Sequence, residues 1–360
     1  MTPPAVVRRL PAARWLALLP RDPRAALLAS DEPSARYVTL TAVLGAPDDD
    51  RAVRAARAAV VADPGVRALV DRLPDWRAGV RFGGHASPAF PPNLLGLLYA
   101  LGVRAGDFAR VDRLLDAMPR QQADDGRYLT PSRGAGTRVQ WASLPCDHVA
   151  ILEALLRFGR RDAPGVDAAL ARVRDTFTAT RQGHAWGCIP DPVVKWRGPG
   201  RTGDACPQVT AEALRLFALV PPAARPRGLV GAARTLLAVW RDRDRAKPYM
   251  FGHGPRFVAG KWPPTWYDVS TVLATLAAYP AVWRGAAATA ADRRATGELV
   301  AALASTFDAD GMITPRSCYQ GFADYSFGQK QRPSPWATAR ACGLLRGFAA
   351  LVPTPAGRSA

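Results

Sequence analysis

Two kinds of apolar pattern alternate along the chain. In the first kind, Ala, Leu and Val recur at positions i, i+3, i+4 and i+7 with Arg, Asp or Glu opposite them, which predicts amphipathic helices over residues 48–73, 105–118, 162–178, 225–243 and 291–306. In the second kind, most sides are apolar, which predicts helices that are covered all round, over residues 94–101, 149–158, 209–219, 269–279 and 339–351. The alternation predicts pairs of helices, one buried and one half-exposed.

A Pro-rich or polar entry precedes each apolar helix and interrupts the helical pattern. These entries recur at intervals of 54 to 71 residues, marked by Ser34, Pro91, Pro145, Asp204, Pro263 and Ser334. Repetition at such a period predicts about six helix pairs. We therefore expect an all-α fold, an α/α toroid (α6/α6 barrel) with an inner and an outer ring. It would form a single domain over residues 1–360, with a helical lead-in over 1–30 and a disordered tail over 352–360.

Composition narrows the class of protein. The chain has 360 residues and is 48% hydrophobic, enough to bury a large core. It contains no run of about 18 apolar residues, so we expect no transmembrane segment. Arginines interrupt the apolar residues near the N-terminus, which argues against a secretory signal. The five cysteines are odd in number and far apart, a pattern that favours a reducing, cytoplasmic setting over a disulfide scaffold.

The net charge of +18 raises the question of nucleic-acid binding. Most of the excess is arginine dispersed over helix faces, which is typical of a solvated basic surface and by itself speaks to solubility. No zinc-finger, homeodomain-like or RNP-type motif accompanies the charge. Nucleic acid stays an alternative partner that no motif supports.

Basic residues lie just before several apolar helices. Helix N-termini favour anions, because their free N–H groups and the macrodipole both point toward the ligand. Arg197, Arg201 and Lys261 are therefore candidates for holding a phosphate or diphosphate group. Exposed loop residues without a ligand are the alternative interpretation.

Aromatic residues concentrate in the loops and helix entries. Trp186, Trp266 and Trp336 are the candidates for contacting an apolar substrate, since aromatic faces offer both apolar area and a quadrupole. Aromatic residues that simply hold loops in place are the alternative.

Three reactive side chains, Cys146, Asp147 and His148, are adjacent at one helix entry. Consecutive residues on a helix point about 100° apart, so we do not expect all three to share one site. Asp147 and His148 are candidates for an acid or a ligand. The alternative is that Asp147 caps the helix while Cys146 packs inward.

A stretch from Arg197 to Cys206 carries a family resemblance. Its Gly-rich basic sequence leads into Asp204-Ala205-Cys206, and loops such as Gln121–Tyr128 and Gln182–Gly187 pair a Gly turn with a nearby aromatic residue. These features resemble protein prenyltransferase β subunits and squalene-hopene cyclases, members of the terpenoid cyclase superfamily, and most of all uncharacterised bacterial proteins of that type.

The resemblance implies a zinc site. The prenyltransferase β subunits have an Asp-X-Cys pair and a later His as zinc ligands, which correspond here to Asp204, Cys206 and, with Asp in place of His, Asp268. Zinc accepts both oxygen and sulfur donors. A capping Asp204 and a buried Cys206 without metal are the alternative.

The same resemblance implies an enzyme that acts on an apolar, isoprenoid diphosphate substrate in a central cavity. Its expected catalytic residues are Asp147, Asp204, His148 and Tyr267. The chain lacks the Asp-X-Asp-Asp motif of class II cyclases and the Asp-rich magnesium motifs of class I synthases. The alternative function is a non-catalytic toroid whose basic rim binds nucleic acid or an anionic partner, and the sequence leaves the need for a partner subunit open.

Overall fold

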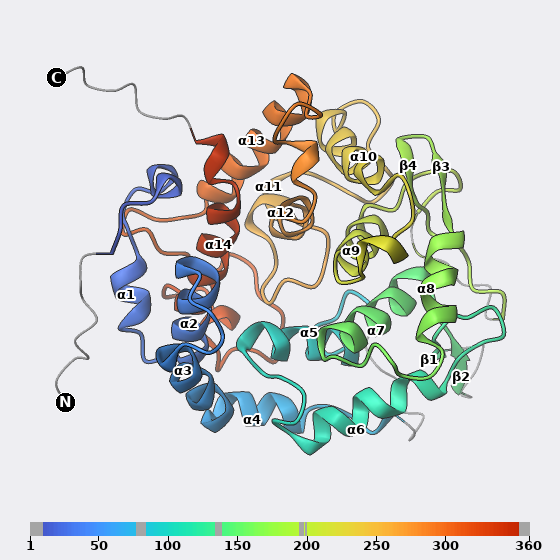
Figure 1. Cartoon of the computed structure of the whole chain (residues 1–360), viewed down its shortest axis with the longest axis horizontal. Helices are drawn as coiled ribbons and strands as arrows, with labels where there is room; N and C mark the ends of the chain where they lie inside the picture. Colours follow the sequence, from blue (N-terminus) through green and yellow to red (C-terminus); the bar gives the residue numbers. More distant parts are fainter. Residues whose placement is uncertain (1–9, 77–83, 134–138, 194–197, 199, 353–360) are drawn as a thin grey trace. The chain divides into compact units, whose positions relative to one another are not determined.

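The structure is a computed structural model that describes residues 10–76, 84–133, 139–193, 198 and 200–352. These residues form two compact units. Unit 1 comprises the described parts of Met1–Gly65, Pro255–Pro264 and Asp268–Ala360, and unit 2 comprises those of Val66–Gly254 and Thr265–Tyr267. Helices dominate both units (Figure 1), which confirms the all-α class expected of an α/α toroid. The expectation of a single domain stays a prediction, and the predicted tail lies almost wholly outside the described residues.

Unit 2 contains most of α4 (Pro64–Asp71) and alternating buried and amphipathic helices. The buried ones are α5 (Pro91–Leu101), α7 (Pro145–Arg157) and α9 (Pro207–Ala218), and the amphipathic ones are α6 (Ala109–Ala117), α8 (Val166–Asp175) and α10 (Leu229–Arg241). Helix α7 packs against α5, α8 and α9, while α10 packs against α9. The alternation predicted from the sequence is thus present in this unit.

Unit 1 repeats the same arrangement. Its helices are α1 (Arg24–Leu28), α2 (Pro33–Val38), which continues as a π-helical turn over Thr39–Leu44, α3 (Arg51–Ala62), α11 (Pro255–Ala259), α12 (Val269–Ala277), α13 (Ala290–Ala304) and α14 (Pro335–Gly347). Helix α14 packs against α2, α12 and α13, and α2 against α3.

Short 3₁₀ segments occur in both units, at Arg14–Leu18, Met118–Arg120, Pro222–Ala224, Pro280–Val282, Ser326–Gly328 and Ala349–Leu351.

Proline begins most of the buried helices, as the entry pattern predicts. Proline has no N–H to leave unsatisfied and its φ suits the first helical turn. Among the described α-helices it is the first residue of α2, α5, α7, α9 and α14, at Pro33, Pro91, Pro145, Pro207 and Pro335, and also of α4 and α11. Helix α12 differs, because the Asp268 carboxylate caps it by accepting from the Thr271 N–H at 2.7 Å.

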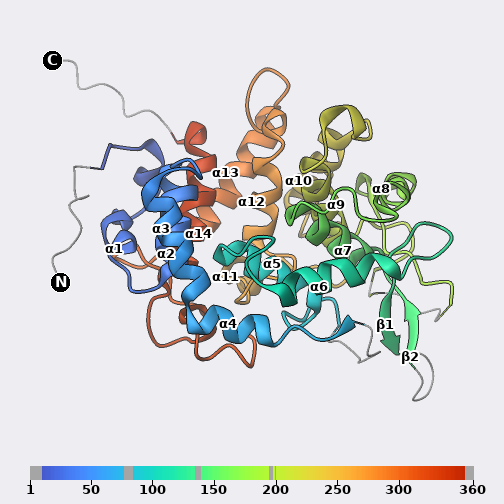
Figure 2. The same cartoon turned by 60° about the horizontal axis from the view of Figure 1, so that its bottom comes forward.

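Two antiparallel hairpins interrupt the helices of unit 2. Strand β1 (Thr130–Arg133) pairs with β2 (Val139–Ala142), placing Thr130 opposite Ala142, and β3 (Phe177–Thr180) pairs with β4 (Gly183–Trp186), placing Phe177 opposite Trp186. The first hairpin follows α6 and precedes α7 along the chain, and Figure 2 shows it extending away from the helices. The pattern predicted the polar turn before β4 and missed the short strands beside it. Within the described residues, no helix has the length and apolar character needed to cross a membrane.

Candidate functional site

The first turn of α7 presents Cys146 and Asp147. Proline at position 145 starts the helix, and the Asp147 side chain folds back so that its Oδ2 accepts from the Leu144 N–H at 3.0 Å. That bond satisfies a backbone donor which the helix start would otherwise leave unpaired. The other oxygen, Oδ1, remains available on the side where Cys146 lies.

His85 faces this helix start from the turn that precedes α5. The side chain of Asn93, on the first turn of α5, donates to the backbone carbonyls of His85 at 2.5 Å and Ser87 at 2.9 Å. These two bonds fix the turn to α5, and the Phe90 ring packs 5.9 Å from the imidazole. His85 is buried, with 7% of its surface exposed.

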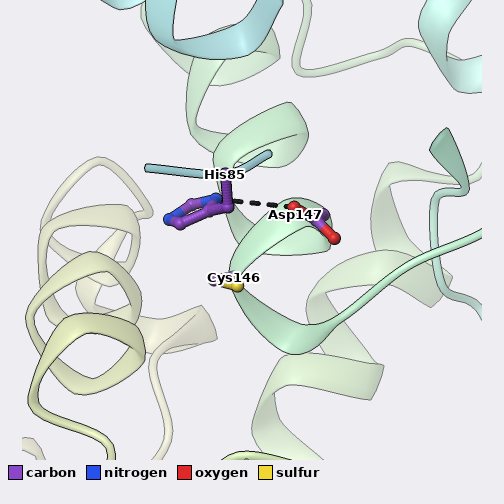
Figure 3. A group of neighbouring side chains, drawn as sticks. All are labelled: His85, Cys146 and Asp147. Atoms are coloured by element: carbon purple, nitrogen blue, oxygen red, sulfur yellow. Dashed lines mark ion pairs between the residues drawn. The ribbon is translucent and has the colours of Figure 1, made fainter. Parts of the chain in front are cut away.

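The three side chains converge on one point. The Nδ1 atom of His85 lies 3.5 Å from Asp147 Oδ1, and one donor atom from each of His85, Cys146 and Asp147 lies within 4.8 Å of the other two. Figure 3 shows Cys146 and Asp147 leaving the start of one helix, with the His85 ring opposite them. Among the residues that the structure describes, this is the one group of three or more His, Cys, Asp or Glu side chains gathered so closely.

Helix α9 supplies the far side of the site. Glu212 Oε1 lies 3.0 Å from His85 Nε2, and Gln208, one turn earlier on the helix, donates from Nε2 to the same oxygen at 2.6 Å. Both side chains are buried, at 4% and 2% exposure. In the neutral form that can bind a metal, a hydrogen on Nε2 would satisfy the Glu212 carboxylate and leave the Nδ1 lone pair on the side of Cys146 and Asp147.

The ionisable side chains of the site are close enough to shift one another's pKa values. Burial lowers the pKa of His85, but the neighbouring Cys146, Glu212 and Asp147 together raise it well above its ordinary value. Burial raises the pKa of the Cys146 thiol to about 11, although His85 acts in the opposite direction. Within the described part of the chain, His85 Nδ1, Glu212 Oε2 and Gln208 Oε1 have no hydrogen-bond partner. Such buried polar atoms are costly unless a further group binds there.

The donor atoms fit a zinc-type ion. Imidazole nitrogen, thiolate sulfur and carboxylate oxygen are the three donor types that zinc accepts, at about 2.0–2.3 Å. Two donors at about 2.1 Å from a tetrahedral ion are about 3.4 Å apart, close to the 3.5 Å between His85 Nδ1 and Asp147 Oδ1. The Glu212 contact adds the carboxylate that zinc-bound histidines usually have on their other nitrogen.

His148, the neighbour of Asp147, turns away from this group. Its Nδ1 accepts from the Tyr128 N–H at 3.0 Å, and its Nε2 lies 3.1 Å from the Ala169 carbonyl. Burial lowers its pKa to about 4. Both ring nitrogens are thus engaged with backbone, and the adjacent Cys146, Asp147 and His148 do not share one site, as predicted from the geometry of a helix.

The residues of the predicted zinc set lie in two units. In unit 2, Asp204 accepts from Arg181 Nη1 at 3.1 Å and from Gln182 Nε2 at 3.2 Å, and Cys206 is buried at the start of α9. In unit 1, Asp268 caps α12. That set stays a prediction.

The predicted substrate-binding residues have varied surroundings. Trp186 and Trp336 are fully buried, and Trp186 donates from Nε1 to the Val173 carbonyl at 2.7 Å. Arg201 and Lys261 are exposed and lie over the rings of Tyr249 and Tyr319, respectively. Arg197 lies outside the described residues.

Two predicted site residues from one short segment do lie near His85. Trp266 is half-buried with its ring centre 6.2 Å from that of the imidazole. Tyr267, a predicted catalytic residue, is buried, and its hydroxyl lies 3.0 Å from His253 Nε2.

The sequence-based reasoning missed His85, Gln208 and Glu212. Each carried a signal: His85 is one of four histidines in the chain and lies just before a Pro-rich entry. Glu212 and Gln208 are polar residues four positions apart on a helix that is otherwise apolar, and burial of a carboxylate requires a partner.

Comparisons with known proteins find similarity to a class of protein other than the terpenoid cyclases and prenyltransferases that the sequence led us to expect. No family model matches the chain, and no curated protein matches it. A solved structure of an unsaturated glucuronyl hydrolase specific for heparin aligns over 88% of this chain and 84% of its own, with 13% identity and a TM-score of 0.49.

The resemblance to terpenoid cyclases and protein prenyltransferases is therefore wrong, and so is the isoprenoid function that it implied. The features that carried it were the Gly-rich basic stretch that leads into Asp204-Ala205-Cys206 and the Gly turns with a nearby aromatic residue, which are short local patterns. They indicate architecture, and architecture does not specify chemistry. A likeness as distant as the one found here carries no argument about activity.

Proposed function

We propose that this chain is a zinc-dependent hydrolase whose metal ligands are His85, Cys146 and Asp147. The observation that carries the proposal is the position of the His85 ring. Its Nδ1 lies 3.5 Å from Asp147 Oδ1, a donor atom of Cys146 lies within 4.8 Å of donor atoms of both residues, and its Nε2 is held by Glu212.

Three protein ligands are the number found in catalytic zinc sites, which keep a fourth position for water or substrate. When bound to His85, Cys146 and Asp147, such an ion would supply a Lewis acid able to activate water near neutral pH, so hydrolysis is the reaction class that the donor set favours. Burial of His85 and Asp147 supports this assignment, because it strengthens interactions with the ion.

Glu212 and Gln208 act through His85. The Glu212 carboxylate fixes the tautomer and orientation of the imidazole and increases the basicity of Nδ1. Gln208 in turn holds the carboxylate by its 2.6 Å bond. Both are positioning residues, since their contacts are to the ligand and not to the fourth position.

A cysteine nucleophile activated by His85 would use the same residues differently. That chemistry requires a hydrogen bond between the thiol and the imidazole and a thiol of low pKa. Among the described residues, the Asp147 carboxylate also faces the imidazole, with its Oδ1 3.5 Å from Nδ1, a third donor that a pair of thiol and imidazole does not need. The geometry therefore favours metal binding, for which a reducing cytoplasmic setting would keep the thiol available.

Metal analysis with cobalt substitution tests the proposal. The purified chain should contain about one equivalent of zinc, and replacement by Co²⁺ should give the thiolate-to-cobalt charge-transfer band of a cysteine ligand. Cys146→Ser should abolish that band, and His85→Ala should abolish stoichiometric binding. Cys206→Ser is the matched control, because Cys206 is a second thiol at the start of a buried helix.

The variants also separate the two zinc sets. A band that survives in Cys146→Ser and disappears in Cys206→Ser would overturn the proposal in favour of the Asp204 and Cys206 set. A wild-type chain that binds no stoichiometric metal after reconstitution would overturn both.

A further inference from the structure

A three-residue segment, Thr265–Tyr267, belongs to the unit that holds the site. The chain on either side of it belongs to unit 1. The Thr265 hydroxyl donates to the carbonyl of Ala86 at 3.0 Å, immediately after His85. This bond places the next residue, Trp266, beside the imidazole.

Trp266 is held there by a series of aromatic contacts. Its ring stacks on Phe251, with ring centres 5.8 Å apart and planes 9° from parallel. Phe251 meets Tyr267 edge-on at 5.5 Å, and the Tyr267 hydroxyl lies 3.0 Å from His253 Nε2. Stacked and edge-to-face pairs of this kind restrict ring orientation, so the Trp266 ring is fixed before any ligand arrives.

Exposure distinguishes Trp266 from the rings that support it. Phe251 and Tyr267 are 2% and 5% exposed, whereas Trp266 is half-buried. Trp266 is therefore the member of the group that solvent reaches, and its ring centre lies 6.2 Å from that of the proposed ligand His85. A group bound to the metal would lie within reach of this indole.

From this juxtaposition we propose that Trp266 is a specificity-determining residue, which selects substrates that carry a planar aromatic ring next to the group that binds the metal. The inference rests on the proposed function, because it places the hydrolysed group at the metal. A ring of that kind gains stacking contact with an indole that is already ordered, so little entropy is lost on binding.

Two metal-binding probes of different shape test the inference. Benzohydroxamate and acetohydroxamate present the same hydroxamate to the ion and differ in the ring. We expect the cobalt-substituted protein to bind benzohydroxamate about tenfold more tightly, as followed by the visible spectrum of the cobalt. Trp266→Ala should remove this preference and leave acetohydroxamate binding within about twofold, whereas Trp266→Phe should retain most of it.

Tyr99→Ala is the matched control, because Tyr99 is also a half-buried aromatic residue of unit 2 and it packs instead against Phe158 and Arg104. Its preference should equal that of the wild type. Equal binding of the two probes by the wild type, or a preference that persists in Trp266→Ala, would overturn the inference. If Trp266→Ala is unfolded by circular dichroism, Trp266→Leu replaces it with the same expectation. A wild-type chain that takes up no cobalt would instead refute the proposed function.

Discussion

Replacing Glu212 with Gln isolates the effect of one charge on the proposed metal site. The amide oxygen can still accept from His85 Nε2 at the observed 3.0 Å, so the tautomer and the side-chain volume are kept while the negative charge is lost. Carboxylates that support a metal-bound histidine typically contribute 10- to 100-fold to metal affinity. Full burial of Glu212 places the expected loss toward the upper half of this range, about 2 kcal/mol.

Competition with a chromophoric chelator measures this change as a Kd for zinc. Glu212→Ala should cost more than Glu212→Gln, because it also leaves His85 Nε2 and Gln208 without their shared acceptor. Glu153→Gln is the control: Glu153 is a second well-covered carboxylate, which joins α7 to α9 through Arg215 and also pairs with Arg157 on its own helix. It should leave the zinc Kd unchanged.

Two results would refute the reasoning. A Glu212→Gln protein with the wild-type Kd would show that the carboxylate does not act on the metal through His85. An equal loss in Glu153→Gln would show that the effect comes from general loosening of the contact between α7 and α9.

Three further predictions concern stability, each measured by urea unfolding. Burial raises the pKa of Glu153, but its two arginine partners lower it to about 2 from the ordinary 4.5, so the carboxylate stabilises the fold by about 3 kcal/mol above pH 4.5. The free energy of unfolding of Glu153→Gln should be lower than that of the wild type by this amount at pH 7. The difference in free energy should shrink as the pH falls from 4.5 toward 2, and a difference that stays constant would contradict the lowered pKa of Glu153. Gly328→Ala should destabilise by about 2 kcal/mol or more, because a Cβ there would lie 1.6 Å from the Phe322 carbonyl oxygen. Gly297→Ala, with no atom within 4 Å of its added Cβ, should stabilise the fold by about 0.5–1 kcal/mol. A Gly297→Ala protein less stable than Gly328→Ala would contradict the packing described around these two glycines. Trp186→Ala should cost about 3–5 kcal/mol and Trp186→Phe less, since Phe keeps most of the buried ring; an equal cost would mean that the indole N–H bond dominates.

Local sequence was sufficient for the helices. The apolar pattern and the proline entries predicted α5, α7, α9 and α14 to within a few residues, because a proline and a helical period act over one or two turns. Strands β3 and β4 were missed, since four-residue strands are too short to show a period.

The site required contacts that no local pattern contains. His85 and Glu212 are 127 residues apart and meet only when α9 packs near the turn before α5. The entries at Asp147 and Asp204 look alike in the sequence, each with a neighbouring Cys and Pro. Only packing distinguishes them, because an imidazole lies beside Asp147 whereas an exposed arginine and a glutamine lie beside Asp204.

The two oxygens of Asp147 connect the N-terminus of α7 with the proposed metal site. One oxygen accepts from the backbone N–H that starts α7, and the other faces His85. A substitution that removes the carboxylate therefore acts on the start of α7 and on the contact with His85 together, so selection for turnover would also act on folding. Anyone who redesigns this centre should therefore keep Asp147 and vary its partners instead.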